Sequence, residues 1–303
     1  MQVFHQFLKD LWQSPHILLI LTTLMWAGHA NVLKVSIGEV SPMLLMALRW
    51  IGCSLILLFF LWSDIKIYLP KARKQWRWLW LMGGLGIAGF TTCLIIAAQY
   101  TSVINLGITQ SFIPALVMLL GIVLLKNTIS GEQGLGLILS MLGAFVLVSG
   151  GSIETIKSMN LNFGDIIMLI GCLCYACYTL GLTKRIELPG MIMFLFFSFF
   201  ASLTHIVGLS FEFLNGNVVW PSPKGWLAVI YCIIFPSIIS QRFFMRGVEL
   251  IGANRAGLYV NLVPVFTAVL AILFLAESLY FFHIVSLILV LGGIYITERF
   301  KRG

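Results

Sequence analysis

The stretch Gly107-Ile-Thr-Gln-Ser-Phe-Ile-Pro114 has a counterpart 150 residues later, Gly257-Leu-Tyr-Val-Asn-Leu-Val-Pro264. Both stretches lie inside apolar runs. The same offset pairs further residues along the chain: Leu125 with Leu275, Thr128 with Ser278, Leu139 with Leu289, and Gly143 with Gly293. The sequence therefore predicts two similar halves, residues 1–150 and 151–303.

The composition points to a membrane protein. Hydrophobic residues make up 60% of the chain, charged residues only 10%, and the mean hydropathy is +1.01. Soluble domains keep about a quarter of their residues charged. The charges here also cluster, which leaves runs that reach or approach the ~20 apolar residues a helix needs to span lipid. We expect an all-α integral membrane protein.

Ten such runs occur, five in each half. They are His16–Lys34, Met43–Trp62, Trp76–Ala98, Leu106–Leu125, Gly134–Gly150, Phe163–Thr183, Gly190–Ser210, Trp226–Met245, Ala256–Ala276 and Phe282–Thr297. Because five is odd, the second half must cross the membrane in the opposite sense to the first. Two inverted five-helix repeats are typical of secondary transporters.

Lysine and arginine predict the orientation. With ten spans and the N-terminus inside, fifteen of them fall on cytoplasmic segments, three on external segments (Lys34, Lys157 and Lys224), and Arg49 lies within a span. This asymmetry predicts cytoplasmic termini in a cell inner (plasma) membrane. The net charge of +8 then faces membrane lipid rather than nucleic acid.

A cleaved signal peptide is an alternative for the first run, since Gly28-His29-Ala30 offers small residues at a cleavage-like position. Against cleavage, Leu24-Met-Trp-Ala27 resembles Leu173-Cys-Tyr-Ala176 of the sixth run. We expect a retained first helix.

The two prolines predict helix breaks. A proline lacks an N–H and frees the carbonyl four residues earlier, here those of Gln110 and Val260. Polar residues accompany both breaks: Thr109, Gln110 and Ser111 in the first half, Tyr259 and Asn261 in the second. Pro114 and Pro264 could simply kink packed helices. The accompanying polar residues favour a solute cavity near the bilayer midplane.

Two ionisable residues lie deep in the first two runs. Arg49 could hold a carboxylate or phosphate of the solute, or it could bind helix-end carbonyls or an acid such as Glu277. His29 could carry a coupling proton, or it could be neutral and hydrogen-bonded. The sequence leaves both choices open.

Further residues are expected to line the cavity. They are Trp26, Gln99, Tyr100 and Tyr175. Gln99 and Tyr100 follow the third run and precede the run that contains Pro114. The aromatic rings of Trp26, Tyr100 and Tyr175 could stack on a flat or apolar solute. Tryptophans at run ends instead suit the membrane interface.

The sequence gives no support for catalysis, a metal or a cofactor. Cys174 and Cys177 form a C-x-x-C within an apolar run, without a histidine at ligand spacing, which favours helix packing. An intramembrane enzyme would need a positioned nucleophile, base or metal, and neither a carboxylate pair nor a histidine cluster lies at membrane depth. An ion channel is a further alternative, although broken, duplicated helices suit alternating access better.

The chain resembles the drug/metabolite transporter superfamily, EamA type, over nearly its whole length. The motifs that carry the resemblance are Trp26-Ala-Gly-His-Ala-Asn-Val-Leu-Lys34, Ser41-Pro42, Arg49-Trp50, Gly252-Ala-Asn-Arg-Ala-Gly257, Asn261-Leu-Val-Pro264, Leu275-Ala-Glu277 and Leu291-Gly-Gly293. His29 stands where relatives often carry asparagine. Asn127 stands where the first repeat often carries the glutamate that Glu277 retains.

The resemblance implies a central cavity and export of a small metabolite, with amino acids and related compounds as common substrates. We expect a secondary active exporter that works by alternating access, as a monomer or homodimer. The alternative is a facilitative exchanger or uptake carrier for a nucleotide-like or other anionic metabolite.

Overall fold

The computed structural model describes residues 6, 9–157, 162–184, 186–274 and 278–299, which form helices and the connections between them. Ten helical segments in this part of the chain are long and apolar enough to cross a membrane. Six of them are single helices: α2 (Pro15–Val35), α3 (Pro42–Phe60), α9 (Gly131–Val148), α11 (Phe163–Gly181), α12 (Gly190–Leu214) and α17 (Phe281–Arg299). The predicted ten-span architecture is confirmed.

The other four spans change their helical geometry part-way. The third and eighth contain π-helical segments, and the fourth and ninth break before their prolines. Their parts are α5 (Trp76–Trp80), η1 (Leu81–Ile87) and α6 (Ala88–Ala97); α7 (Val103–Gln110) and α8 (Ile113–Leu125); α13 (Pro223–Ile233), η2 (Ile234–Ile239) and α14 (Ser240–Ile251); α15 (Ala253–Leu258), η3 (Tyr259–Asn261) and α16 (Leu262–Phe274). Irregular segments of this kind are often found at functional sites.

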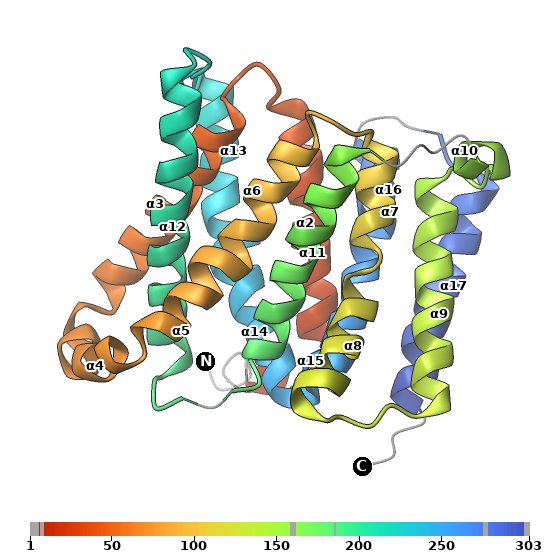
Figure 1. Cartoon of the computed structure of the whole chain (residues 1–303), viewed down its shortest axis with the longest axis horizontal. Helices are drawn as coiled ribbons and strands as arrows, with labels where there is room; N and C mark the ends of the chain where they lie inside the picture. The colour runs from red at the N-terminus through yellow and green to blue at the C-terminus, as the bar shows by residue number, and fades with distance from the viewer. Residues whose placement is uncertain (1–5, 7–8, 158–161, 185, 275–277, 300–303) are drawn as a thin grey trace.

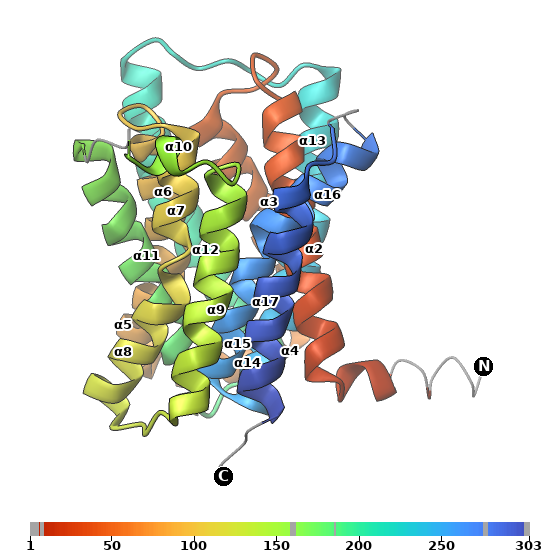
Figure 2. The same cartoon turned by 90° about the vertical axis from the view of Figure 1, so that its right-hand side faces the viewer.

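The two halves run through the bundle in opposite directions. α2 begins and α17 ends at the same end of the bundle (Figure 2), whereas α11, the first span of the second half, begins at the opposite end (Figure 1). The five spans of each half therefore form the inverted repeats that their odd number predicts.

α9 and α17 form a closely packed pair. A Cβ atom on Gly143 would lie 2.8 Å from Val290 Cγ2, and one on Gly136 would collide with Thr297 Oγ1. Gly143 and Gly293, which are 150 residues apart, both lie in this contact. Small residues let helices in lipid approach this closely.

Two shorter helices do not span: α4 (Trp62–Lys74) and α10 (Ile153–Lys157). α4 projects from the bundle at the end where α2 begins (Figure 1). It belongs to a segment that the sequence predicts to be a cytoplasmic connection, and Lys66, Lys71, Arg73 and Lys74 are exposed on it.

The eighth span is longer than predicted. The predicted run contains Arg242 and ends at Met245, before Arg246, but the helix continues to Ile251. The guanidinium groups of Arg242 and Arg246 lie over the ring of Trp12, 4.6 and 5.7 Å from its centroid. These contacts accommodate both charges without ending the helix.

Candidate functional site

Arg49 of α3 is buried inside the bundle and contacts the π-helical segment η2. The residue is only 3% exposed. Nε donates to Ser237 Oγ at 2.5 Å, and Nη2 donates to the backbone carbonyl of Pro236 at 3.1 Å. Of the alternatives that the sequence left open, the structure shows a backbone carbonyl as a partner of Arg49. Glu277, the acid considered for this role, lies outside the described residues.

Pro236 explains the position of the Ser237 hydroxyl. Because proline has no N–H, the carbonyl of Cys232 loses its usual donor. Ser237 Oγ donates to that carbonyl at 2.7 Å and accepts from Arg49. The sequence analysis missed this break, although a proline inside the eighth apolar run is a visible signal.

His29 of α2 contacts the same guanidinium group. Arg49 Nη1 lies 3.3 Å from His29 Nε2. Trp26 lies one helical turn earlier on α2, and both Trp26 and His29 are partly exposed. Trp26 follows Pro15 by eleven residues and precedes Val35 by nine, so it lies near the middle of the span.

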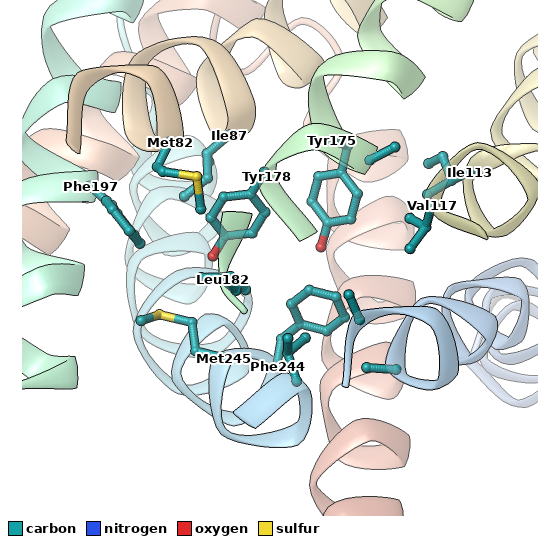
Figure 3. Packing of buried hydrophobic residues seen from close by; sticks show 14 of the residues in the cluster. Met82, Ile87, Ile113, Val117, Tyr175, Tyr178, Leu182, Phe197, Phe244 and Met245 are labelled. Atoms are coloured by element: carbon teal, nitrogen blue, oxygen red, sulfur yellow. The ribbon is translucent and has the colours of Figure 1, made fainter. Parts of the chain in front are cut away.

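An aromatic cluster lies beside Trp26. The Trp26 ring meets Tyr175 of α11 edge-on at 6.0 Å and Phe244 of α14 at 5.3 Å. Tyr175 also packs against Phe90 of α6 at 5.2 Å and Tyr178 at 5.6 Å. Figure 3 shows the hydroxyl of Tyr175 directed toward Phe244, with Tyr178 to the left of its ring and Ile113 and Val117 of α8 to the right.

The two tyrosine hydroxyls of this cluster differ in their bonding. Tyr178 Oη donates to Gln241 Oε1 at 3.3 Å. Tyr175 Oη is buried and has no hydrogen-bond partner within the described part of the chain. A buried hydroxyl without a partner carries a desolvation cost, which a bound polar group or water would relieve.

In the polar triplet of the fourth span, two side chains bond to the backbone and the third is partly exposed. Thr109 Oγ1 donates to the carbonyl of Asn105, and Ser111 Oγ donates to that of Ile108. Gln110 is partly exposed at the end of α7, and no hydrogen bond to its side chain occurs among the described residues. Cys172 Sγ of α11 contacts the Thr109 carbonyl at 3.5 Å, which places this break beside α11.

The polar residues of the ninth span lie elsewhere. Asn261, 1% exposed, donates from Nδ2 to Ser140 Oγ of α9 at 2.9 Å. Tyr259, 3% exposed, has its hydroxyl 2.6 Å from His16 Nδ1. These side chains join helices, and the described contacts do not bring them to the Trp26 cluster.

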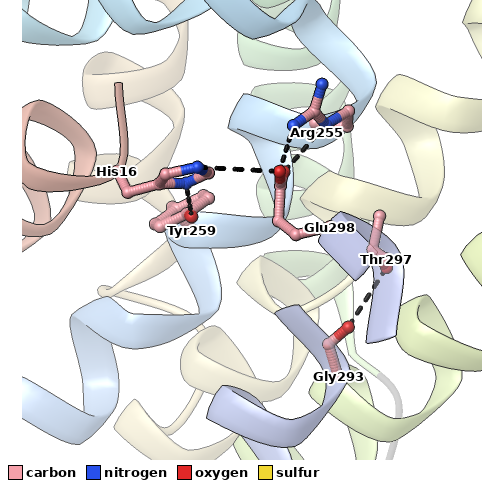
Figure 4. A network of polar contacts seen from close by, with 6 residues as sticks. All are labelled: His16, Arg255, Tyr259, Gly293, Thr297 and Glu298. Carbon is pink, nitrogen blue, oxygen red and sulfur yellow. Dashed lines mark hydrogen bonds and ion pairs between the residues drawn. The ribbon is translucent and has the colours of Figure 1, made fainter. Parts of the chain in front are cut away.

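Tyr259 belongs to a network at the end of the bundle where α2 begins. His16 lies between Tyr259 and Glu298 of α17 (Figure 4), with Nε2 3.8 Å from Glu298 Oε2. Glu298 also pairs with Arg255 of α15, whose Nε lies 2.8 Å from Oε1. The network links α2 of the first repeat to α15, η3 and α17 of the second.

Gln99 and Tyr100 are not at mid-membrane depth. α6 ends at Ala97, and both residues are exposed in the turn that follows. Tyr100 packs edge-on against Phe163 at 5.8 Å, at the start of α11. The third span is thus too short to carry these two side chains inward as the sequence predicted.

Pro114 and Pro264 lie just after the breaks. Pro114 is in the first turn of α8, following the two-residue interruption at Ser111 and Phe112. Pro264 follows the short 3₁₀ segment η3. No group of three or more His, Cys, Asp or Glu side chains suited to a metal ion occurs among the residues described.

Comparison with known proteins supports a transport role. The model of the EamA-like transporter family matches residues 13–149 and 162–299. An "uncharacterized transporter" YyaM of Bacillus subtilis (strain 168) is 26% identical over 92% of each chain. An "uncharacterized transporter" of Archaeoglobus fulgidus is 27% identical over 94% of this chain and 97% of the relative.

A solved crystal structure shares the fold. It superposes with a TM-score of 0.77 at 18% identity and covers 95% of this chain and 99% of its own. At this identity the likeness concerns the fold alone.

Proposed function

Because this chain belongs to the EamA-like transporter family, a family of membrane transporters, we propose that it is a secondary active exporter of a small metabolite. The solute would be an amino acid or a related compound, carried across the cell inner membrane by alternating access. The inverted five-helix repeats support this mechanism, since such repeats place their substrate sites between broken helices near the midplane.

The proposed site rests on one observation: polar side chains lie within the membrane-spanning helices without hydrogen-bond partners in the described part of the protein. The side chain of Gln110 and the hydroxyl of Tyr175 have no hydrogen-bond partner in the described part of the chain. Trp26, which packs against Tyr175, and His29 are partly exposed. Polar groups in lipid are costly unless they face protein, water or a ligand. We assign the solute to these four residues.

Arg49 lies behind this surface rather than on it. Its guanidinium group donates to Ser237 and to the Pro236 carbonyl, and the residue is almost fully buried. This placement argues against the uptake carrier for a nucleotide-like anion, which would need an accessible cation to bind phosphate.

The termini are assigned to the cytoplasm. The exposed lysines and arginine of α4 lie at the end of the bundle where α2 begins, which agrees with the excess of positive charge on cytoplasmic segments. The network of His16, Tyr259, Arg255 and Glu298 lies at the same end. We assign it to the contacts that keep the cytoplasmic side closed and must open for solute to enter from the cell.

The breaks before Pro114 and Pro264 supply the moving joints of this scheme. Each divides a span into two helical parts whose backbone hydrogen bonding is already interrupted. Bending at such a break costs fewer intact hydrogen bonds than bending a continuous helix.

The test combines a ligand screen with counterflow. A metabolite that binds the native protein raises its melting temperature in a concentration-dependent way. Proteoliposomes preloaded with that unlabelled metabolite should take up the labelled form faster than empty ones. Equal uptake with and without preloading would indicate a pore and contradict the carrier.

Gln110→Ala tests the site within the same assay. Loss of one hydrogen bond to the solute, about 1 kcal/mol, should raise the half-saturating concentration about fivefold. Thr183→Ala is the matched control, because Thr183 is exposed at the end of α11 and bonds only its own helix. Wild-type kinetics in Gln110→Ala would show that Gln110 does not contact the solute.

A further inference from the structure

We propose that Arg49 is a positioning residue that fixes His29 as a hydrogen-bond donor, so that the site selects solutes carrying a carboxylate or carbonyl acceptor. This inference rests on the proposed function, which supplies the solute. The chemistry of the contact is argued from the geometry of His29. The inference assigns the polar contact to His29 and only an indirect role to Arg49.

The bonding of the guanidinium group determines which ring nitrogen carries the proton. Arginine has five N–H donors and no acceptor. Arg49 Nη1 lies 3.3 Å from His29 Nε2, so Nε2 must accept. A neutral imidazole that accepts at Nε2 carries its proton on Nδ1. A doubly protonated ring would place two donors against each other at this contact.

Arg49 is itself held from the opposite side. Ser237 Oγ and the Pro236 carbonyl accept two of its N–H groups, and the Trp50 ring lies 4.9 Å from its guanidinium carbon. The proline break in η2 supplies these acceptors. The orientation of Arg49, and through it the protonation of His29, is therefore set by a side chain and a backbone carbonyl of the eighth span.

The donor of His29 is directed away from this network. Nδ1 has no hydrogen-bond partner within the described residues, and it is not among their buried unpaired atoms. His29 as a whole is partly exposed. Nδ1–H is thus the group offered to an incoming solute, with the positive charge of Arg49 behind it.

The neighbours of His29 complete the chemical description. Trp26 is one helical turn away on the same face of α2, where residues three apart meet. Its ring joins the Tyr175 and Phe244 cluster. A solute that matches this site has a hydrogen-bond acceptor attached to a flat or apolar group, and an anionic acceptor would bind more tightly. A protonated amine in place of the acceptor would place its N–H donors against the Nδ1–H donor of His29.

The protonation of His29 can be read directly. The full chain, labelled with ¹⁵N-histidine and reconstituted in lipid, would be measured by solid-state NMR at pH 7. The His29 signal is the one of five histidines that disappears in His29→Asn. We expect a neutral ring protonated on Nδ1. A ring protonated on Nε2, or on both nitrogens, would overturn the proposal without bearing on whether the protein transports.

The role of Arg49 is tested by changing its hydrogen-bonding group. In Arg49→Gln the fixed donor array is lost, and the His29 ring should become a mixture of tautomers. If that variant does not fold, Ser237→Ala removes the Nε acceptor of Arg49 and should broaden the same signal. An unchanged single tautomer in a folded variant would show that Arg49 does not position His29.

Three probes of one shape test the solute class: phenylacetate, phenylacetamide and phenethylamine. Tryptophan fluorescence should report binding of the acid and the amide, and at least tenfold weaker binding of the amine, as expected for a hydrogen bond to a charged group of about 1.5 kcal/mol or more. His29→Leu should weaken phenylacetate by about tenfold. His29→Asn, whose amide can accept from Arg49 and still donate, should restore most of that affinity.

His283→Leu is the matched control, because His283 lies at the start of α17 and bonds the Tyr280 backbone. It should leave all three affinities unchanged. Equal binding of the three probes, binding by none of them, or an unaltered His29→Leu would overturn the assigned solute class. Counterflow with a metabolite found by the ligand screen would still test transport separately.

Discussion

In the first repeat, His29 of α2 contacts Arg49 of α3, whereas in the second repeat Tyr178 of α11 packs against Phe197 of α12. The positions correspond. Trp26 and Tyr175 stand in the matching segments Leu24-Met-Trp-Ala27 and Leu173-Cys-Tyr-Ala176, and Arg49 and Phe197 are each the eighth residue of their helix. The inverted backbone plan is shared, but one pair is polar and the other aromatic.

The difference separates the two ends of the bundle chemically. α2 and α11 begin at opposite ends of the bundle (Figure 1). His29 lies in the second half of α2 and Tyr178 in the last turn of α11, so Tyr178 lies toward the end where α2 begins and His29 toward the opposite end. The aromatic pair packs its rings together, while in the polar pair Arg49 is buried and His29 is partly exposed. Under the proposed function, the solute would meet a different chemistry at each end of a symmetric fold.

The largest expected effect comes from removing the polar pair. Arg49→Leu deletes three hydrogen bonds, to Ser237 Oγ, the Pro236 carbonyl and His29 Nε2. At about 1 kcal/mol each, their loss should lower the free energy of unfolding by about 3 kcal/mol. Denaturant or thermal unfolding in detergent measures this. Arg73→Leu, on the exposed surface of α4, is the control and should change stability little. Equal stability of the two variants would contradict the network.

A smaller effect is expected in the aromatic pair. Tyr178→Phe keeps the ring packing and loses only the hydrogen bond to Gln241, so stability should fall by about 1 kcal/mol. Gln241→Leu in the same background should cost less than it does alone, because the partner is already missing. Full additivity of the two changes would show that the bond contributes nothing.

The smallest effect on stability is expected at Tyr175, whose ring packs against Tyr178 and Trp26. Tyr175→Phe removes a buried hydroxyl with no partner among the described residues, so unfolding should be unchanged or slightly harder, by less than about 1 kcal/mol. Solute affinity should fall in the same variant if the hydroxyl meets the solute. A loss of stability as large as that of Tyr178→Phe would reveal an internal partner for Tyr175.

The sequence predicts the fold better than the site. All ten spans follow from the length and spacing of the apolar runs, because lipid allows few alternatives to a helix of fixed minimum length. The burial of Arg49 was also predicted from its depth. Its partners on the eighth span were not predicted. Pro236 has a glycine, Gly86, as its counterpart 150 residues earlier, so this proline is not a feature that the two halves share.

Side-chain direction is the second gap. Tyr259 and Asn261 were predicted to line the cavity because they accompany the helix break at Pro264. They lie in a 3₁₀ segment, which turns about 120° per residue rather than the 100° of an α-helix. Their side chains contact His16 and Ser140. The sequence contains the proline that permits this change, but not the tertiary contacts that select it.

The close contact of α9 and α17 has a consequence for how motion in this protein is measured. Backbone and side-chain atoms of one helix occupy the space beside the glycines of the other, so the two cannot slide or rotate against each other without steric overlap. We expect the pair to move as one rigid body. It supplies an internal frame of reference, against which displacement of the eight remaining spans can be expressed without reference to the lipid.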